Sequence, residues 1–338
     1  MRRRSPSLWL LWTVGMSVIA CGQESRSDSS LRSIIDEDSL QPVGDGTQLP
    51  ASLRGSLGAI GKLTGGCTAF HLGDGLVATA GHCLPKPTKT VAESACGTYS
   101  IQWNGEAQPS HCLRYLAYQY DEQSDFALIE VDPLPPTHIH LPTRDDRADR
   151  PSRALVIGYP KDRPLSTTAQ ACQARWETGT DEQKFFHDCD TLPGHSGSPV
   201  LDADSAQLIG VHDGDAEKAN YGSFLPSLRQ LHQLQEQLRA EAPPPSQLSF
   251  GPFGNNEMRV LFAIPSRWSK RAKLHVHANL EAPYDKLVLI DGIGRRTELT
   301  GASDQDLDLP LPLSAFVQTD YSGNSQLIEV KDLTLYTP

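Results

Sequence analysis

The sequence is poor in positive charge. Its 338 residues carry 30 basic and 41 acidic side chains, which gives a formal net charge of −11 at pH 7. The basic residues form no stripe along the sequence, although such a stripe is the usual electrostatic signature of a nucleic-acid-binding protein. We therefore expect no nucleic-acid partner.

The sequence also lacks a hydrophobic run long enough for a comfortable membrane span. An apolar stretch of thirteen residues, LWLLWTVGMSVIA at 8–20, follows the basic start MRRRSPS, and this pattern predicts a signal for export at 1–20. The end of the stretch, Val18 to Cys21, resembles the lipobox of bacterial lipoproteins. That resemblance implies cleavage before Cys21 and a lipid anchor on its thiol, in the outer membrane if the envelope has two; an ordinary signal peptide is the alternative.

The seven cysteines include no Cys-x-x-Cys pair, which argues against a zinc site. With Cys21 assigned to lipid, six cysteines remain, and an oxidising compartment would allow them to pair. We expect nearest neighbours to pair, although other connectivities remain formally open. The expected disulfides are Cys67–Cys83, Cys96–Cys112 and Cys172–Cys189.

Long helical patterns are scarce. Short runs such as GLVATA, FALIEVD and QLIGVHDG, broken by Gly, Pro and Asp, predict strands through 51–225. A leucine stripe at helical spacing predicts one amphipathic helix at 226–242. We expect an all-β domain at 51–242, a tether or propeptide at 21–50, and a small β-sandwich at 247–338 after a proline-rich linker.

Three short motifs carry candidate chemistry. His82 lies in TAGHC, Asp125 in SDFAL and Ser196 in GHSGSP. A serine hydroxyl becomes an effective nucleophile when an imidazole removes its proton, and a buried carboxylate holds that imidazole in the required tautomer. Asp121 is a second candidate for the carboxylate, but Asp125 is favoured because it directly precedes an apolar strand.

These motifs, in this order, resemble those of the chymotrypsin-like serine endopeptidases, and most closely the bacterial glutamyl-endopeptidase branch, over about 34–241. The resemblance implies two perpendicular β-barrels and a C-terminal helix. It also implies that His82 is the general base, Asp125 its orienting acid and Ser196 the nucleophile, with the backbone N–H groups of Gly194 and Ser196 as the oxyanion hole. No cofactor is implied.

Two features depart from the trypsin pattern. His195 stands where trypsin-type enzymes carry Asp, and we expect it to be a solvent-facing turn residue. The segment IIDEDSLQPV at 34–43 resembles the mature start of glutamyl endopeptidases, which implies cleavage near Ile34 and release from the anchor. An ordinary first strand is the alternative.

The residues of the specificity pocket leave alternatives open. Thr191 and His212 match the positions that bind an acidic P1 side chain in glutamyl endopeptidases, and both are suited to charge-assisted hydrogen bonds. Asp190, however, matches the position at which trypsin selects basic residues, and Asp213 and Asp215 add negative charge. The pocket therefore accepts acidic P1 residues, basic ones, or a more restricted set.

The C-terminal region faintly resembles CUB-like accessory domains but lacks their cysteines. His275 and His277 alternate onto one face of a strand, which is half of a metal site or simply a solvated surface. Nearby aspartates match a calcium loop or a solvated acidic loop; they are Asp304, Asp306 and Asp308. We assign no metal, and expect this domain to bind another protein or a surface ligand.

Together these features predict an extracytoplasmic, lipid-anchored serine endopeptidase that acts on proteins or peptides. The alternative from another class is a catalytically silent surface lipoprotein that uses a protease-like fold for binding. A third possibility is a protein that cleaves only itself, near residue 34.

Overall fold

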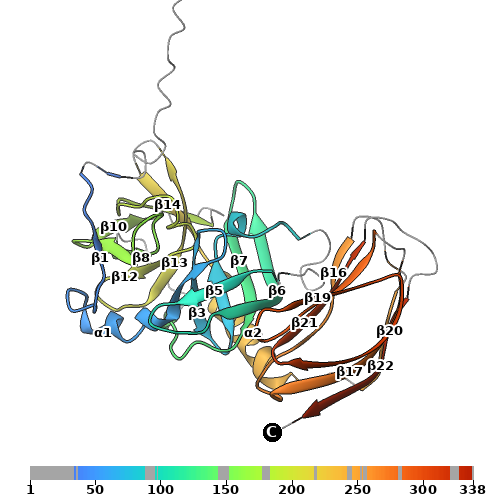
Figure 1. The fold of residues 1–338 in the computed structure, drawn as a ribbon. Helices are drawn as coiled ribbons and strands as arrows, with labels where there is room; N and C mark the ends of the chain where they lie inside the picture. The colour runs from blue at the N-terminus through green and yellow to red at the C-terminus, as the bar shows by residue number, and fades with distance from the viewer. Residues whose placement is uncertain are drawn as a thin grey trace, which may run out of the picture.

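A computed structural model describes residues 34–336, except for 36, 88–95, 97, 144–151, 177–182, 217–218, 242–245, 252, 254–256, 281–283 and 320–326. The export signal, Cys21 and the tether up to residue 33 lie outside the described residues, as does most of the proline-rich linker. The chain forms two neighbouring β-barrels followed by a separate pair of sheets (Figure 1).

The first barrel contains six antiparallel strands and closes in the order β2-β3-β4-β7-β6-β5. Every residue of β3, β4 and β7 is buried, as their runs of apolar and β-branched residues predict. The strands are β2 (Ile60–Leu63), β3 (Thr68–Gly73), β4 (Leu76–Thr79), β5 (Ser100–Trp103), β6 (Ser110–Tyr120) and β7 (Asp125–Asp132).

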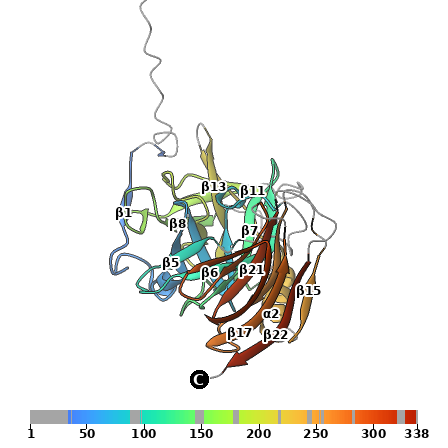
Figure 2. The same cartoon turned by 45° about the vertical axis from the view of Figure 1, so that its right-hand side comes forward.

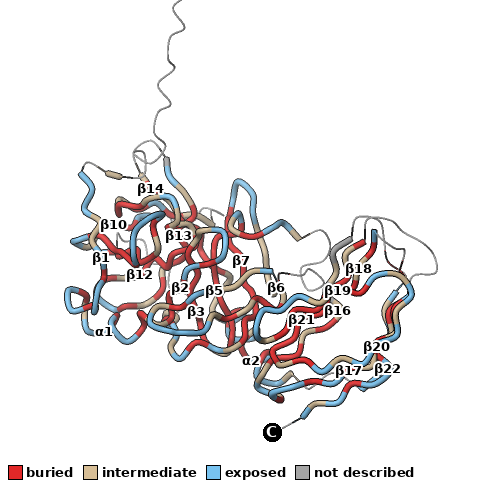
Figure 3. The backbone as a smooth tube through the Cα atoms, viewed as in Figure 1, coloured by how far each residue is buried: buried red, intermediate tan, exposed pale blue. Residues whose placement is uncertain are grey.

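The second barrel contains six further strands and closes where β8 pairs with β12. Its strands are β8 (Ser152–Gly158), β10 (Cys172–Arg175), β11 (Lys184–His187), β14 (Ala219–Ser223), β13 (Leu208–Ala216) and β12 (Pro199–Asp202). The expected chymotrypsin-like double barrel is confirmed. Figure 3 shows buried residues along the strands of both barrels.

The segment before residue 51 belongs to the folded domain, so its assignment to a tether is wrong for residues 35–50. Strand β1 (Leu40–Pro42) pairs with β9 (Ser166–Thr168), which extends the sheet from β8. Val43 is 1% exposed within the largest apolar core. The pairing partner is more than a hundred residues away in sequence. The apolar start of this segment left an ordinary first strand as an alternative, but no local pattern indicated which strand it would join. Helix α1 (Ala51–Arg54) and the 3-10 turn η2 (Leu57–Ala59) follow it.

Helix α2 (Leu228–Ala240) confirms the helix predicted from the leucine stripe. Ser227 caps it: its side chain accepts from the Gln230 N–H, while the Gln230 side chain accepts from the Ser227 N–H. Leu231 and Leu238 are buried against the barrels. Both views place α2 where the first barrel and the C-terminal sheets meet (Figures 1 and 2). Among the described residues, no helix has the length and apolar character needed to cross a membrane.

All three expected disulfides are present, namely Cys67–Cys83, Cys96–Cys112 and Cys172–Cys189. The second barrel therefore carries one bridge and the first barrel two. Each closes a short loop, 16 or 17 residues in sequence separation. Bridges of this size typically stabilise a domain by about 2–4 kcal/mol.

The C-terminal region forms two four-stranded antiparallel sheets that enclose their own apolar core. One sheet contains β15 (Leu248–Phe250), β22 (Leu327–Tyr336), β17 (Arg271–Asn279) and β20 (Ala302–Pro310), and the other contains β16 (Glu257–Ile264), β21 (Leu313–Thr319), β18 (Lys286–Ile290) and β19 (Arg296–Thr300). This is the β-sandwich that the alternating sequence pattern predicted.

A polar contact joins the sandwich to the first barrel. The Asp132 carboxylate, 1% exposed, accepts hydrogen bonds from the N–H and the hydroxyl of Ser266 at 2.8 and 2.5 Å. Glu130, equally buried, pairs with Arg114 of the barrel and with Arg267 of the C-terminal region. Buried carboxylates are costly unless they are paired, so these contacts connect the two units.

Candidate active site

His82 lies in a single 3-10 turn, η3 (Gly81–Cys83), directly after β4. The disulfide from Cys83 to Cys67 ties this turn to the start of β3. Asp125 is the first residue of β7, which pairs with β4. This pairing brings the end of β4 beside the beginning of β7, and so His82 lies next to Asp125.

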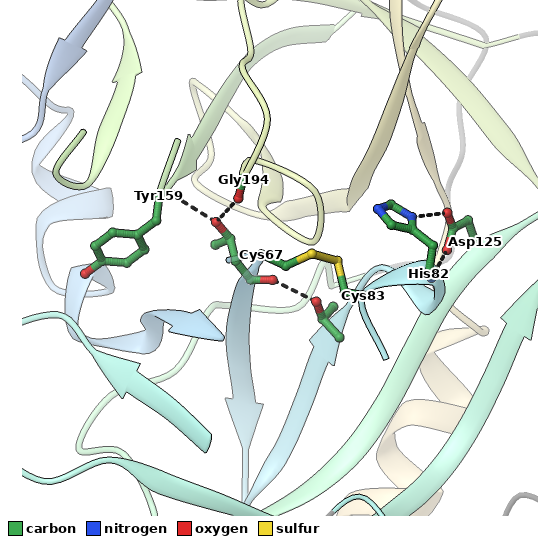
Figure 4. The surroundings of a disulfide bond; sticks show 8 residues. Cys67, His82, Cys83, Asp125, Tyr159 and Gly194 are labelled. Carbon is green, nitrogen blue, oxygen red and sulfur yellow. Dashed lines mark hydrogen bonds and ion pairs between the residues drawn. A yellow bond between two sulfur atoms is a disulfide. The ribbon is translucent and has the colours of Figure 1, made fainter. Parts of the chain in front are cut away.

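The Asp125 carboxylate holds His82 at two points (Figure 4). Oδ2 lies 2.6 Å from Nδ1 of the His82 ring, and Oδ1 accepts the His82 backbone N–H at 3.0 Å. Because a carboxylate only accepts hydrogen bonds, Nδ1 carries the proton and Nε2 is left to act as a base. The hydrogen bond from Asp125 raises the pKa of His82, while burial opposes that rise.

Glycine is required at position 81 to bring the two residues this close. A Cβ there would lie 2.4 Å from the Gln119 carbonyl and 3.0 Å from Asp125 Oδ1. Asp121, the other candidate carboxylate, is exposed and accepts the N–H groups of Gln123 and Ser124 within its own turn. Asp125, and not Asp121, is therefore the carboxylate that contacts His82.

Ser196 lies in a turn that packs directly on the ends of β3 and β4. Its carbonyl accepts the N–H of Thr68 at 2.8 Å. Gly197, with φ of 85°, has no room for a side chain, since a Cβ would lie 2.1 Å from the Thr68 carbonyl and 2.3 Å from Thr79 Oγ1. Thr68 follows Cys67, and Thr79 precedes His82 by three residues. The turn therefore brings Ser196 to the same end of the barrel as the imidazole.

The Ser196 hydroxyl makes no hydrogen bond to any residue that the structure describes. A ring nitrogen of His82 lies within 4.8 Å of both sulfur atoms of the Cys67–Cys83 bridge. In Figure 4 the second ring nitrogen faces away from Asp125, toward the side on which Gly194 lies. The bridge thus lies between the imidazole and the strand on which the serine turn packs; its sulfurs are bonded to each other and are not metal ligands.

Hydrogen bonds fix the two peptides that were expected to form an oxyanion hole. The Pro193 carbonyl accepts from Lys161 N–H at 2.6 Å, and the His195 carbonyl accepts from Ser198 N–H at 2.8 Å. Because C=O and N–H point in opposite directions across a trans peptide, these bonds also set the directions of the Gly194 and Ser196 N–H groups. Neither N–H has a partner among the described residues.

His195 is not solvent-facing, and that expectation is wrong. Its side chain is 0% exposed, and Nδ1 accepts the Leu192 N–H at 2.9 Å, so the ring folds back into its own turn. It packs over Gly158 of β8, where a Cβ would lie 2.9 Å from the ring. Burial lowers the pKa of His195 to about 4. His195 is therefore a neutral structural residue that supports the nucleophile turn.

Asp190 is occupied by the N-terminal segment. Its carboxylate is 4% exposed. It accepts the Ile35 N–H at 2.7 Å, the Ser39 N–H at 2.9 Å and the Ser39 hydroxyl at 2.5 Å. These three hydrogen bonds stabilise the buried carboxylate within the protein.

Thr191 and His212 are both buried beside the nucleophile turn. Thr191 is 1% exposed, and its hydroxyl has no partner among the described residues. His212 is held by its backbone, which donates to Ser198 O and accepts from Gly197 N–H. Burial lowers the pKa of His212 well below its ordinary value, so the ring is neutral.

Near the site, His187 and Ser223 were not singled out from the sequence, and Asp213 was expected only to add negative charge to the pocket. His187 Nε2 lies 3.1 Å from His212 Nδ1, which forms a buried histidine pair. Asp213 and Ser223 form a second hydrogen-bonded pair behind Asp125. The alternation of KFFH is consistent with an inward-facing His187, but no sequence signal indicated that these residues meet.

The histidines of the C-terminal sheet contact aspartates. His275 lies 2.8 Å from both Asp304 and Asp306, and His277 lies 3.2 Å from Asp304. Asp308 pairs with Arg271 instead. These side chains are exposed or partly exposed and form a solvated polar surface.

Comparison with known proteins agrees with this geometry. Residues 67–211 match the trypsin-like peptidase domain family. This segment contains His82, Asp125 and Ser196. The trypsin-like peptidase domain covers less than half of the chain, and the sandwich lies outside it.

Individual relatives are distant. The chain is 24% identical to a glutamyl endopeptidase of Bacillus licheniformis over 197 residues, 54% of this chain and 59% of that protein. A solved Glu endopeptidase structure in complex with MPD has a TM-score of 0.45 at 18% identity and covers 61% of this chain and 99% of its own. An inactive form of Rv3671c from M. tuberculosis H37Rv has a TM-score of 0.39 at 18% identity, covering 63% and 100%.

Proposed function

We propose that this protein is a serine endopeptidase in which Ser196 attacks the scissile carbonyl. The observation that carries the proposal is the double hold of Asp125 on His82, at 2.6 and 3.0 Å, at the barrel end on which the Ser196 turn packs. A histidine fixed in this tautomer can take a proton through Nε2, which is the role that acyl transfer requires of it.

The reaction follows from these positions. His82 removes the Ser196 hydroxyl proton as Oγ bonds to the carbonyl carbon, and the imidazolium formed is stabilised by Asp125. The oxyanion is bound by the N–H groups of Gly194 and Ser196, whose peptides are already fixed. His82 then gives the proton to the leaving amine, and water releases the acyl group by the same steps in reverse.

A fluorophosphonate probe tests this proposal against the silent binding module. The wild-type protein should be labelled at Ser196, and Ser196→Ala should abolish both labelling and peptide hydrolysis. Ser198→Ala is a suitable control, since it removes a neighbouring buried hydroxyl that has no partner among the described residues. Absence of labelling in folded wild-type protein would favour the binding module. Cleavage near residue 34 without turnover of added peptide would favour self-processing.

We further propose that the substrate carries an acidic P1 residue. A basic side chain would have to compete with Ile35 and Ser39 for Asp190, whose carboxylate already accepts three hydrogen bonds. Thr191 offers a buried hydroxyl without a partner among the described residues, and His212 offers a neutral imidazole. Both groups suit a carboxylate better than an ammonium ion.

Matched peptides with Glu, Gln or Lys at P1 test the preference. Glu peptides should have the highest kcat/KM. Thr191→Val, which keeps the shape and removes the hydroxyl, should lower kcat/KM for Glu by roughly 10-fold or more, since a hydrogen bond to a charged group contributes about 1.5–3 kcal/mol. Thr191→Ser should retain most activity. Faster cleavage of Lys peptides would refute acidic P1.

We propose that the protein is exported and anchored through lipid on Cys21, with cleavage near Ile34 as a route of release. The proposal is supported by the sequence of residues 1–21. Cys21→Ser should move the protein from the membrane fraction to the soluble fraction and abolish incorporation of labelled fatty acid. Unchanged fractionation of the variant would contradict it.

We propose that the sandwich positions a protein or surface ligand relative to the candidate active site. The contacts of Asp132 with Ser266 and of Glu130 with Arg267 support a fixed arrangement. Deleting residues 247–338 should leave hydrolysis of short peptides largely intact and reduce that of a protein substrate. Equal loss on both substrates would contradict a positioning role.

A further inference from the structure

A second buried carboxyl lies behind Asp125. Asp213 in β13 is 4% exposed, and its Oδ2 accepts a hydrogen bond from the Ser223 hydroxyl. The Ser223 oxygen in turn accepts the backbone N–H of Asp125 at 2.8 Å. One hydroxyl group thus connects the Asp213 carboxyl to the residue that orients His82.

Because a hydroxyl has a single proton, the donor and acceptor in each hydrogen bond of Ser223 can be assigned. Ser223 has one proton to donate, and it donates that proton to Asp213 while a lone pair accepts from Asp125. Asp213 therefore fixes the rotation of the Ser223 hydroxyl, and Ser223 fixes the backbone of Asp125. Asp125 then holds both the ring and the backbone of His82.

The charges around Asp213 are unbalanced. Negative charge comes from Asp125 on β7, positive charge from Lys184 on β11 and, when protonated, His82, and the Tyr221 ring approaches from β14. Asp213 Oδ1 has no hydrogen-bond partner among the described residues. Burial raises the pKa of Asp213 to about 7, and the charge of Asp125 adds to the effect. When ionised, Asp213 raises the pKa of His82.

We propose that Asp213 is a positioning residue of the catalytic site, acting through Ser223, and that its charge state sets the pH range in which His82 serves as the base. The catalytic part of this statement rests on the proposed function. Ionised Asp213 raises the pKa of His82, and protonated His82 lowers the pKa of Asp213, so these two groups titrate as a coupled pair. Ionised Asp213 stabilises the imidazolium that forms during acyl transfer, and neutral Asp213 does not.

Asp213→Asn tests the proposal because asparagine keeps an oxygen that can accept from Ser223 but has no charge at any pH. The acidic limb of the kcat/KM profile should move to lower pH, since the negative charge that raises the pKa of His82 is gone. At the alkaline plateau, kcat should fall by roughly 10-fold with KM little changed, because a tenfold change corresponds to about 1.4 kcal/mol of transition-state stabilisation. A profile that superimposes on the wild type would overturn the proposal.

Asp215→Asn is the matched control, since it removes the same charge two residues away at an exposed position. Its pH profile should not move. Ser223→Ala keeps the Asp213 carboxyl but breaks the connection, and should lower kcat more than it raises KM. A purely structural role would reduce stability in both variants without shifting the profile.

NMR titration of the His82 ring separates this proposal from the proposed function. In Asp213→Asn the imidazole should titrate at lower pH than in the wild type, whether or not the protein hydrolyses peptides. If that variant does not fold, carboxyl-carbon NMR of the wild type should show Asp213 titrating near pH 7 together with His82. Titration of Asp213 near pH 4, independent of His82, would overturn the proposal.

Discussion

Asp190→Asn distinguishes an anchor for the N-terminal segment from a selector of basic substrates. The carboxylate accepts three hydrogen bonds from Ile35 and Ser39, and it is 4% exposed. In asparagine, one oxygen becomes an NH₂ group that faces N–H donors and cannot accept from them. Each hydrogen bond to a charged group contributes about 1.5–3 kcal/mol, and bonds that share an acceptor are not additive. We therefore expect the free energy of unfolding to fall by about 3 kcal/mol.

Denaturant unfolding and calorimetry measure the effect, and for a domain of this size the loss corresponds to a decrease in Tm of roughly 6–12 °C. Asp38→Asn is the control on the same segment. Its pair with Arg163, at 2.6 Å, is 39% exposed on both sides and should contribute about 1 kcal/mol or less. The ratio of kcat/KM for Glu peptides to kcat/KM for Lys peptides should be the same in Asp190→Asn as in the wild type. Unchanged stability combined with loss of cleavage after Lys would refute the reasoning.

Three further changes test other parts of the structure. Replacing both Cys67 and Cys83 with serine removes the bridge of sequence separation 16 and should lower the free energy of unfolding by about 3 kcal/mol. The same double variant should have a lower kcat/KM in peptide assays, and full activity would argue against a bracing role of the bridge. Asp125→Asn should shift the acidic limb of kcat/KM to lower pH, because Asp125 raises the pKa of His82, and should lower kcat on the order of 10⁴-fold; an unmoved limb would contradict the assigned pair. Asp132→Ala should cost about 2–3 kcal/mol and make the connection to the sandwich more sensitive to limited proteolysis; resistance equal to the wild type would show that this contact is dispensable.

The sequence was most informative where the decisive information was local. His82 and Asp125 each adjoin an apolar strand, and the observed pairing of β4 with β7 brings them together. The helix at 228–240 was predictable because leucine spacing and a Ser227 cap lie within one continuous segment. The disulfides followed from order along the chain, since each bridge closes a short loop.

The sequence was least informative where a residue's environment comes from a distant segment. His195 reads as an exposed turn residue, yet it is covered because Gly158 of β8 leaves space for its ring. Asp190 reads as a pocket residue, yet its partners Ile35 and Ser39 precede it by 155 and 151 residues. Neither contact leaves a periodic or compositional trace, so neither was accessible from the sequence.

The sequence by itself showed that a histidine, an acid and a serine suited to acyl transfer are present, and that each lies next to a short strand. Alternation and turn residues specify such elements because each side chain's face depends on its near neighbours. Only the tertiary structure decided which buried carboxyl groups are hydrogen-bonded and which residues are their partners. In the folded protein Asp190 accepts hydrogen bonds from the N-terminal segment, and Asp213 lies behind Asp125. These contacts depend on strands that meet only when both barrels close.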